Sequence, residues 1–277
     1  MKMDSLEKLA KVRLKRTIAT LYKLINDEKV HLDIILAGGN SGIMCAHIAH
    51  IFYNHIAQQP PEIIRIPFVR YKPNKKEIPQ NRWDNSILKY AVKNQIKEHN
   101  IESFKNILFI DTEIGTGTTS ENCLKLLLEV IEYREKQELT YYIIAENFDF
   151  ELFETPSNIK VHFRPPAQGI EGLYEVVTNI LPEKTERLMR EVFPKPPYEK
   201  QHLINVLMDL PSRSKENPLE GFNLKNNYVA QKRIDNLKTL KGQFNKNLAS
   251  LIEEAVEEYK EGKIDLSNEN YLGDFGR

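Results

Sequence analysis

Two carboxylates and a loop of glycine and threonine stand together in residues 107–119, Ile-Leu-Phe-Ile-Asp-Thr-Glu-Ile-Gly-Thr-Gly-Thr-Thr. The apolar start is typical of a buried strand, from which Asp111 and Glu113 are expected to point to one side. Glycine lets a ligand approach the backbone, and threonine hydroxyls and helix-start amides donate hydrogen bonds to phosphate. Carboxylates suit the hydroxyl groups of a sugar. The predicted phosphate loop comprises Gly115, Thr116, Gly117, Thr118 and Thr119.

A second glycine-rich turn, Ala37-Gly-Gly-Asn-Ser-Gly, follows the apolar residues 32–36. We expect Asn40 or Ser41 to cap a helix over residues 43–58. Glycine tolerates the strained backbone conformations that a tight turn after a strand can require.

Positive charge is concentrated in residues 65–82, although the whole chain balances 39 basic against 39 acidic side chains. The segment holds six basic residues and one acid, Glu77, for a net charge of +5. Its prolines and asparagines are typical of a loop, and a basic loop can close over an anionic ligand. A solvated basic loop without a ligand would have the same composition. The basic residues are Arg65, Arg70, Lys72, Lys75, Lys76 and Arg82.

These three features, in this order, resemble the type I phosphoribosyltransferases, and the resemblance covers residues 30–182. It implies transfer of ribose 5-phosphate from phosphoribosyl diphosphate to a nitrogenous base, with release of diphosphate. It also implies Mg²⁺ as a cofactor held mainly by substrate oxygens. In the family the two acids are usually adjacent, whereas here Thr112 separates Asp111 from Glu113.

The resemblance also implies a role for each matching residue. Asp111, with Glu113, would bind the ribose hydroxyls, and the phosphate loop would bind the 5′-phosphate. Arg70 would stabilise the departing diphosphate together with further basic and backbone groups. Those further groups are the side chains of Lys72, Lys75 and Lys76 and the backbone amides of Ala37, Gly38 and Gly39.

The sequence leaves two main hypotheses about function open. The first is an active phosphoribosyltransferase, favoured by the basic loop because only a leaving diphosphate needs it. The second is a non-catalytic ligand-sensing or scaffold protein that keeps the sugar-phosphate pocket, favoured by Thr112 and the C-terminal helices. A role in RNA binding is weaker, because acidic residues in the last long helix would repel phosphates.

Segments with strand and helix patterns alternate up to residue 181. This alternation predicts an α/β fold, a mainly parallel sheet with helices on both faces, as the resemblance also implies. Residues 1–25 predict an amphipathic helix. The predicted strands cover residues 32–36, 63–71, 106–110, 139–145 and 159–163, and the later helices cover residues 43–58, 84–99, 120–134 and 169–181.

Near residue 182 the composition changes, so we predict an α/β domain over residues 1–182 and a helical C-terminal extension over residues 183–277. A long helical pattern covers residues 228–259, with lysines and arginine before glutamates. This order opposes the helix macrodipole. Antiparallel pairing with a second copy would match basic with acidic halves in a homodimer. Alternatively, the charged face is solvated and the apolar stripe packs on its own core.

Composition bounds the class of protein. With 41% hydrophobic residues and zero net charge, the chain is not a long disordered one, and a generic nucleic-acid binder is disfavoured. Cys45 and Cys123 lie in apolar helical patterns and are expected to stay reduced. No segment approaches the roughly 18 apolar residues of a membrane span, and the first residues do not form a secretory signal. We therefore expect a cytoplasmic protein without a membrane partner.

Overall fold

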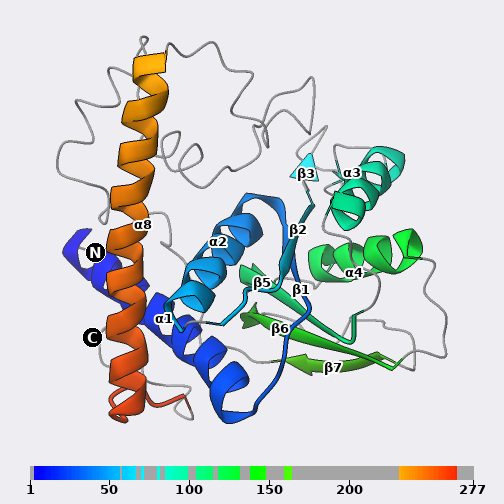
Figure 1. The fold of residues 1–277 in the computed structure, drawn as a ribbon. Coiled ribbons are helices and arrows are strands. Elements are labelled where there is room, and N and C mark those ends of the chain that lie inside the picture. Colours follow the sequence, from blue (N-terminus) through cyan, green and yellow to red (C-terminus); the bar gives the residue numbers. More distant parts are fainter. Residues whose placement is uncertain are drawn as a thin grey trace. The chain divides into compact units, whose positions relative to one another are not determined.

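The computed structural model describes residues 3–56, 58–66, 70–71, 80–81, 85–98, 104–114, 118–131, 138–147, 159–163 and 231–266 (Figure 1). They belong to two compact units, which are described separately. The sheet unit comprises Thr20–Ala46 and Pro60–Gly169, and the helical unit comprises Met1–Ala19, His47–Gln59 and Ile170–Arg277. The predicted domain boundary at residue 182 and the predicted helix over residues 169–181 lie outside the described residues.

Five parallel strands form the sheet of the sheet unit, in the order β2-β1-β5-β6-β7. All four neighbouring pairs are parallel, which confirms the prediction of an α/β fold built on a parallel sheet. Apolar and β-branched residues dominate these strands, as expected where helices bury a sheet. The strands are β1 (Ile34–Gly38), β2 (Glu62–Ile66), β5 (Asn106–Ile114), β6 (Leu139–Asn147) and β7 (Ile159–Phe163).

Five α-helices are described, and a π-helical turn, Lys23–Asp27, continues the first of them. The second half of α1 departs from the predicted amphipathic pattern, because residues 14–21 are all buried, including Lys15 and Arg16. Within the described residues, no helix is long and apolar enough to cross a membrane. The helices are α1 (Met3–Tyr22), α2 (Gly39–His55), α3 (Asn85–Glu98), α4 (Thr118–Val130) and α8 (Gln231–Lys260).

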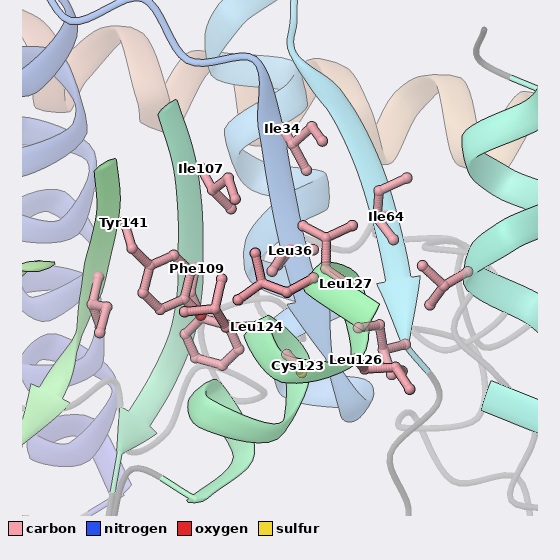
Figure 2. Close-up of a cluster of buried hydrophobic side chains, with 14 of the residues drawn as sticks. Ile34, Leu36, Ile64, Ile107, Phe109, Cys123, Leu124, Leu126, Leu127 and Tyr141 are labelled. Atoms are coloured by element: carbon pink, nitrogen blue, oxygen red, sulfur yellow. The ribbon is translucent and has the colours of Figure 1, made fainter. Parts of the chain in front are cut away.

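Helices α3 and α4 pack against each other and against one face of the sheet (Figure 1). On this face, alternate strand residues such as Leu36 and Phe109 pack against residues of α4 such as Leu127 and are buried (Figure 2). The intervening residues Ile35 and Ile110 are also buried, so both faces of the sheet are covered. Around the central strands β1 and β5, the described residues therefore leave the strand ends, and not the faces, for a ligand.

The connections between strands change direction at β1 and β5, which are neighbours. From β1 the chain moves to β2 on one side, and from β5 it moves to β6 and β7 on the other. Because crossovers between parallel strands are right-handed, the helices that follow β1 and β5 leave toward opposite faces. Open α/β sheets bind ligands at such a switch point, outside the carboxyl ends of the strands.

Two predicted boundaries are wrong. The strand expected over residues 63–71 ends at Ile66, and β3 (Arg70–Tyr71) pairs antiparallel with β4 (Gln80–Asn81) in a separate two-stranded sheet. Helix α2 begins at Gly39, four residues earlier than expected, so no separate loop follows β1. Gly39 has φ of 67°, a backbone conformation that glycine adopts without strain as the chain turns from strand to helix, and the side chains of the predicted caps Asn40 and Ser41 are not described.

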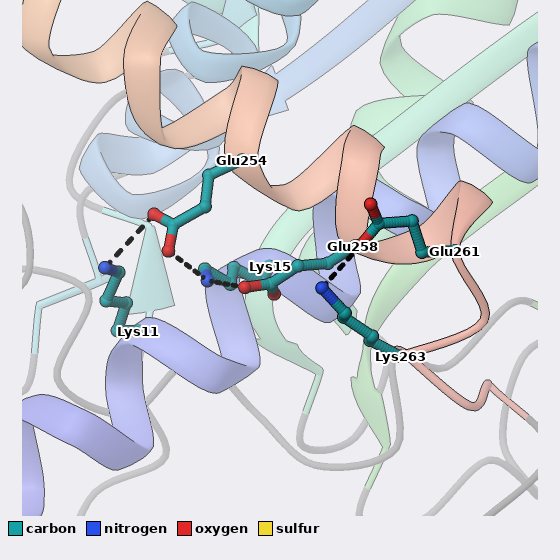
Figure 3. A network of polar contacts seen from close by, with 6 residues as sticks. All are labelled: Lys11, Lys15, Glu254, Glu258, Glu261 and Lys263. Carbon is teal, nitrogen blue, oxygen red and sulfur yellow. Dashed lines mark hydrogen bonds and ion pairs between the residues drawn. The ribbon is translucent and has the colours of Figure 1, made fainter.

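Within the helical unit, the acidic end of α8 forms ion pairs with α1 (Figure 3). Nζ of Lys15 lies 2.7 Å from a carboxylate oxygen of Glu254 and 2.7 Å from one of Glu258, and Nζ of Lys11 lies 3.2 Å from Glu254. We call these four residues the α1–α8 ion cluster. Two acidic groups of α8 thus have basic partners in the same chain, and the homodimer remains a prediction.

Candidate functional site

The two predicted anion-binding elements lie side by side at the switch point. Gly38 is the last residue of β1, and Thr119 lies in the first turn of α4. A Cβ atom placed on Gly38 would be 3.1 Å from Cγ2 of Thr119. The end of the phosphate loop therefore contacts the glycine turn, although 81 positions separate them in the sequence.

The side chain of Cys123 occupies the space beside Gly38. A Cβ atom on Gly38 would lie 2.9 Å from Sγ of Cys123 and 3.4 Å from Cε2 of Phe109. Residue 38 must therefore be glycine for α4 to approach β1 this closely. The sequence predicts this glycine for contact with a ligand, whereas in the structure its first role is helix–strand packing.

Two helices begin at these strand ends, α2 at Gly39 and α4 at Thr118. Amides in the first turn of a helix have no partner within the helix, and the helix dipole places partial positive charge there. Gly42 lies close to both strands, since a Cβ on it would be 3.4 Å from the carbonyl carbon of Ala37 and from the oxygen of Ile110. Helix starts of this kind are common binding places for phosphoryl groups in proteins.

Asp111 continues β5 beyond Ile110 and is only 7% exposed. Burial raises the pKa of the Cys45 thiol well above its usual value, and the nearby charge of Asp111 raises it further. The same two causes raise the pKa of Cys123. Asp111 therefore lies near two protonated thiols, one on α2 and one on α4. Neither thiol is a nucleophile at neutral pH, because the thiolate is the reactive form.

The expected same-side placement of Asp111 and Glu113 rests on strand alternation, which is interrupted here. Ile110 pairs with Ile144, and the next pair is Glu113 with Glu146, so β5 contains one residue more than β6 over this stretch. Such a bulge changes the direction of the following side chains. The structure describes the backbone of Glu113 and not its side chain, so its sugar-binding role stays a prediction.

Several other predicted site residues lie wholly or partly outside the described residues. Arg70 and Thr118 are described by their backbones alone, in β3 and at the start of α4. The first three residues of the phosphate loop and the predicted basic groups of the loop between β3 and β4 are outside. These residues are Gly115, Thr116, Gly117, Lys72, Lys75 and Lys76.

One polar pair at this site was missed by the sequence analysis. The hydroxyl of Tyr141 in β6 donates a hydrogen bond to the backbone oxygen of Ser120 at 3.1 Å. Oγ of Ser120 lies 2.9 Å from the same hydroxyl. The sequence provided only a weak indication of this pair. A tyrosine inside a buried strand needs a hydrogen-bond partner, but the sequence does not show which residue that partner is.

A protein-bound metal centre finds no support in the described part of the chain. There, no group of three or more His, Cys, Asp or Glu side chains could hold a metal ion. The prediction that substrate oxygens supply most Mg²⁺ ligands is not tested by this observation.

Comparisons with known proteins add no family. No family model matches the chain, and no curated protein and no solved structure was found to be similar to it.

Proposed function

We propose that the chain binds phosphoribosyl diphosphate at the carboxyl ends of β1 and β5 and transfers its ribose 5-phosphate to a nitrogenous base. The observation that carries this proposal is the contact between the Gly38 turn and the start of α4 at the switch point. A substrate with a phosphate at one end and a diphosphate at the other needs two neighbouring anion sites. The strand order alone is shared by other α/β ligand-binding proteins, so it supports the place of binding and not the ligand.

The phosphate loop and the first turn of α4 would bind the 5′-phosphate, with Asp111 and Glu113 toward the ribose hydroxyls. The leaving diphosphate would meet the amides at the start of α2, so Gly38 and Gly39 act from a helix start and not from a separate loop. Arg70 and the lysines Lys72, Lys75 and Lys76 would contact the leaving diphosphate. Their positive charge would stabilise the negative charge that develops on the diphosphate.

The reaction requires positioning more than covalent chemistry. The bond from the anomeric carbon to diphosphate breaks as the base arrives, through a state with oxocarbenium character. Mg²⁺ would neutralise the diphosphate, bound mainly by substrate oxygens, because it keeps few protein ligands. The residues of this chain would hold the ribose and the two anionic ends in line for attack.

A specific observation favours the second candidate, a non-catalytic protein that senses the same ligand. Asp111 is 7% exposed and lies by two protonated thiols. A carboxylate in this position can contact a ligand only if the ligand comes close to the carboxyl end of β5. A protein that binds without turnover can keep a carboxylate this deeply buried, because it does not have to release product at every cycle.

Calorimetry with phosphoribosyl diphosphate, with and without Mg²⁺, tests the shared ligand of both candidates. An assay of diphosphate release across a panel of purine and pyrimidine bases then separates them. Turnover with one base establishes the enzyme, whereas micromolar binding without turnover establishes the sensor. No binding at millimolar ligand would contradict both.

The double variant Asp111→Asn with Glu113→Gln tests the ribose contacts. We expect binding of phosphoribosyl diphosphate to weaken by at least tenfold, because two charge-assisted hydrogen bonds are lost. The control is Glu129→Gln, which removes one charge from the exposed side of α4, where Glu129 pairs with Lys89. If the double variant binds as tightly as the wild type, the ribose assignment is wrong.

A further inference from the structure

Tyr141 holds the backbone of α4 from inside the core. It is fully buried in β6, beside Phe109 and beneath α4 (Figure 2). Its hydroxyl donates to the carbonyl oxygen of Ser120, the third residue of α4. Most contacts between α4 and the sheet are apolar, so this hydrogen bond gives the first turn of the helix a directional attachment to the sheet.

The hydroxyl groups of Tyr141 and Ser120 can both form hydrogen bonds at the same time. A tyrosine has one proton, and here it goes to the carbonyl oxygen of Ser120. The hydroxyl of Ser120 can then donate its own proton to the tyrosine oxygen, 2.9 Å away. Burial, together with the nearby Cys123, raises the pKa of Tyr141 well above its usual value, against the hydrogen bond from Ser120. Tyr141 therefore stays protonated and remains a donor.

The apolar packing does not require this hydroxyl. Phenylalanine would fill the same space between Phe109 and α4, and an oxygen is worth burying only where it has partners. Both partner atoms belong to Ser120, which follows Thr119 directly, and Thr119 lies next to Gly38. The hydroxyl thus fixes the turn in which the phosphate loop ends.

We propose that Tyr141 is a positioning residue that sets the first turn of α4 for binding of the 5′-phosphate. This assignment rests on the proposed function, because it deepens the phosphate end of that same site. It also separates the two anionic ends of the substrate: the described hydrogen bonds of the hydroxyl go to Ser120 of α4, so we expect the diphosphate end at the start of α2 to respond much less.

The variant Tyr141→Phe tests the assignment by calorimetry with three ligands. We expect about tenfold weaker binding of phosphoribosyl diphosphate and of ribose 5-phosphate, as for one lost hydrogen bond. Binding of inorganic diphosphate with Mg²⁺ should change by less than about twofold. A merely structural role would weaken all three ligands alike or none of them.

Two further variants complete the experiment. Tyr142→Phe is the matched control, since Tyr142 is the next residue of β6 and stacks its ring on His162 at 5.3 Å; it should bind all three ligands as the wild type does. Ser120→Ala keeps the carbonyl partner and should weaken the two phosphoribosyl ligands by about twofold to threefold. It carries the test if Tyr141→Phe does not fold.

The outcomes separate this assignment from the proposed function. If the wild type binds neither phosphoribosyl ligand, the proposed function fails and the assignment fails with it. If the wild type binds both and Tyr141→Phe binds them equally well, only the assignment is overturned. A uniform loss for all three ligands overturns it too, because the hydroxyl would then support the fold and not the phosphate end.

Discussion

At the carboxyl end of β1, the fold depends on a residue without a side chain. A Cβ atom on Gly38 would lie only 2.9 Å from Sγ of Cys123 and 3.1 Å from Cγ2 of Thr119. The pair brings α4 against β1 and brings the two candidate anion sites into contact. Packing and the proposed ligand binding would therefore depend on the same few atoms.

The variant Gly38→Ala should destabilise the protein by about 1–3 kcal/mol, because the added methyl group overpacks a buried site. Cys123→Ala should cost about 1 kcal/mol as a single change, through the small cavity that it leaves. Combined, the two should cost less than the sum, since the smaller residue makes room for the new Cβ. Urea denaturation of all four proteins measures the coupling. Additive effects would show that Cys123 is not the obstacle.

At the scale of elements, strands and helices were largely predictable, and their ends were not. The expected strand at residues 159–163 matches β7, and the expected helix at residues 84–99 matches α3 to within one residue. Composition and periodicity determine such elements. The start of α2 and the bulge in β5 depend on neighbouring strands, so a single segment could not indicate them.

Replacing two glycines in or next to α8 by alanine should change the free energy of unfolding in opposite directions. Gly242 lies within the helix, and a Cβ on it would meet nothing within 4 Å, so Gly242→Ala should stabilise by about 0.5–1 kcal/mol. Gly262 ends the helix with φ of 72°, and the next amide, that of Lys263, donates to the oxygen of Glu258. Gly262→Ala should destabilise by about 1 kcal/mol, because alanine is strained there. Thermal unfolding measures both; a shared sign would contradict the assigned helix end.

At the scale of the whole molecule, contacts between distant parts of the chain were beyond sequence reasoning. The α1–α8 ion cluster joins residues 239 and 243 positions apart. The unusual charge order of α8 suggested either an antiparallel second copy or, as the simpler interpretation, a solvated charged face. In the structure, Lys11 and Lys15 of the same chain contact two of its glutamates, a pairing that the sequence did not indicate.

The α1–α8 ion cluster should give the helical unit a defined pH range. A hydrogen bond from Lys15 holds the pKa of Glu254 below 4.5, so this contribution is present above that pH and is lost as pH falls through the folded-state value. Burial alone would lower the pKa of Lys15, but Glu254 and Glu258 raise it above 10.5. The contribution of Lys15 to stability is therefore fully present below pH 10.5, and it is lost as the pH rises through the folded-state pKa of Lys15.

The variant Lys15→Met should destabilise the protein by about 1–3 kcal/mol at pH 7, because two carboxylates lose their shared partner. The loss relative to wild type should be smaller at pH 3, because the ion pair is lost as pH falls through the lowered folded-state pKa of Glu254. Lys11→Met is the control and should cost below about 1 kcal/mol, since that pair is exposed. Denaturation at both pH values provides the measurement. A loss that does not depend on pH would indicate packing of the lysine stem and not its charge.

Hydrogen exchange with and without phosphoribosyl diphosphate and Mg²⁺ tests the central claim most directly, because it locates the bound ligand on the chain. We predict that ligand slows exchange in peptides covering residues 37–45 and 111–122, at the two strand ends, and leaves α8 unchanged. Saturating ligand that protects neither segment, or that protects only residues elsewhere, would contradict the account.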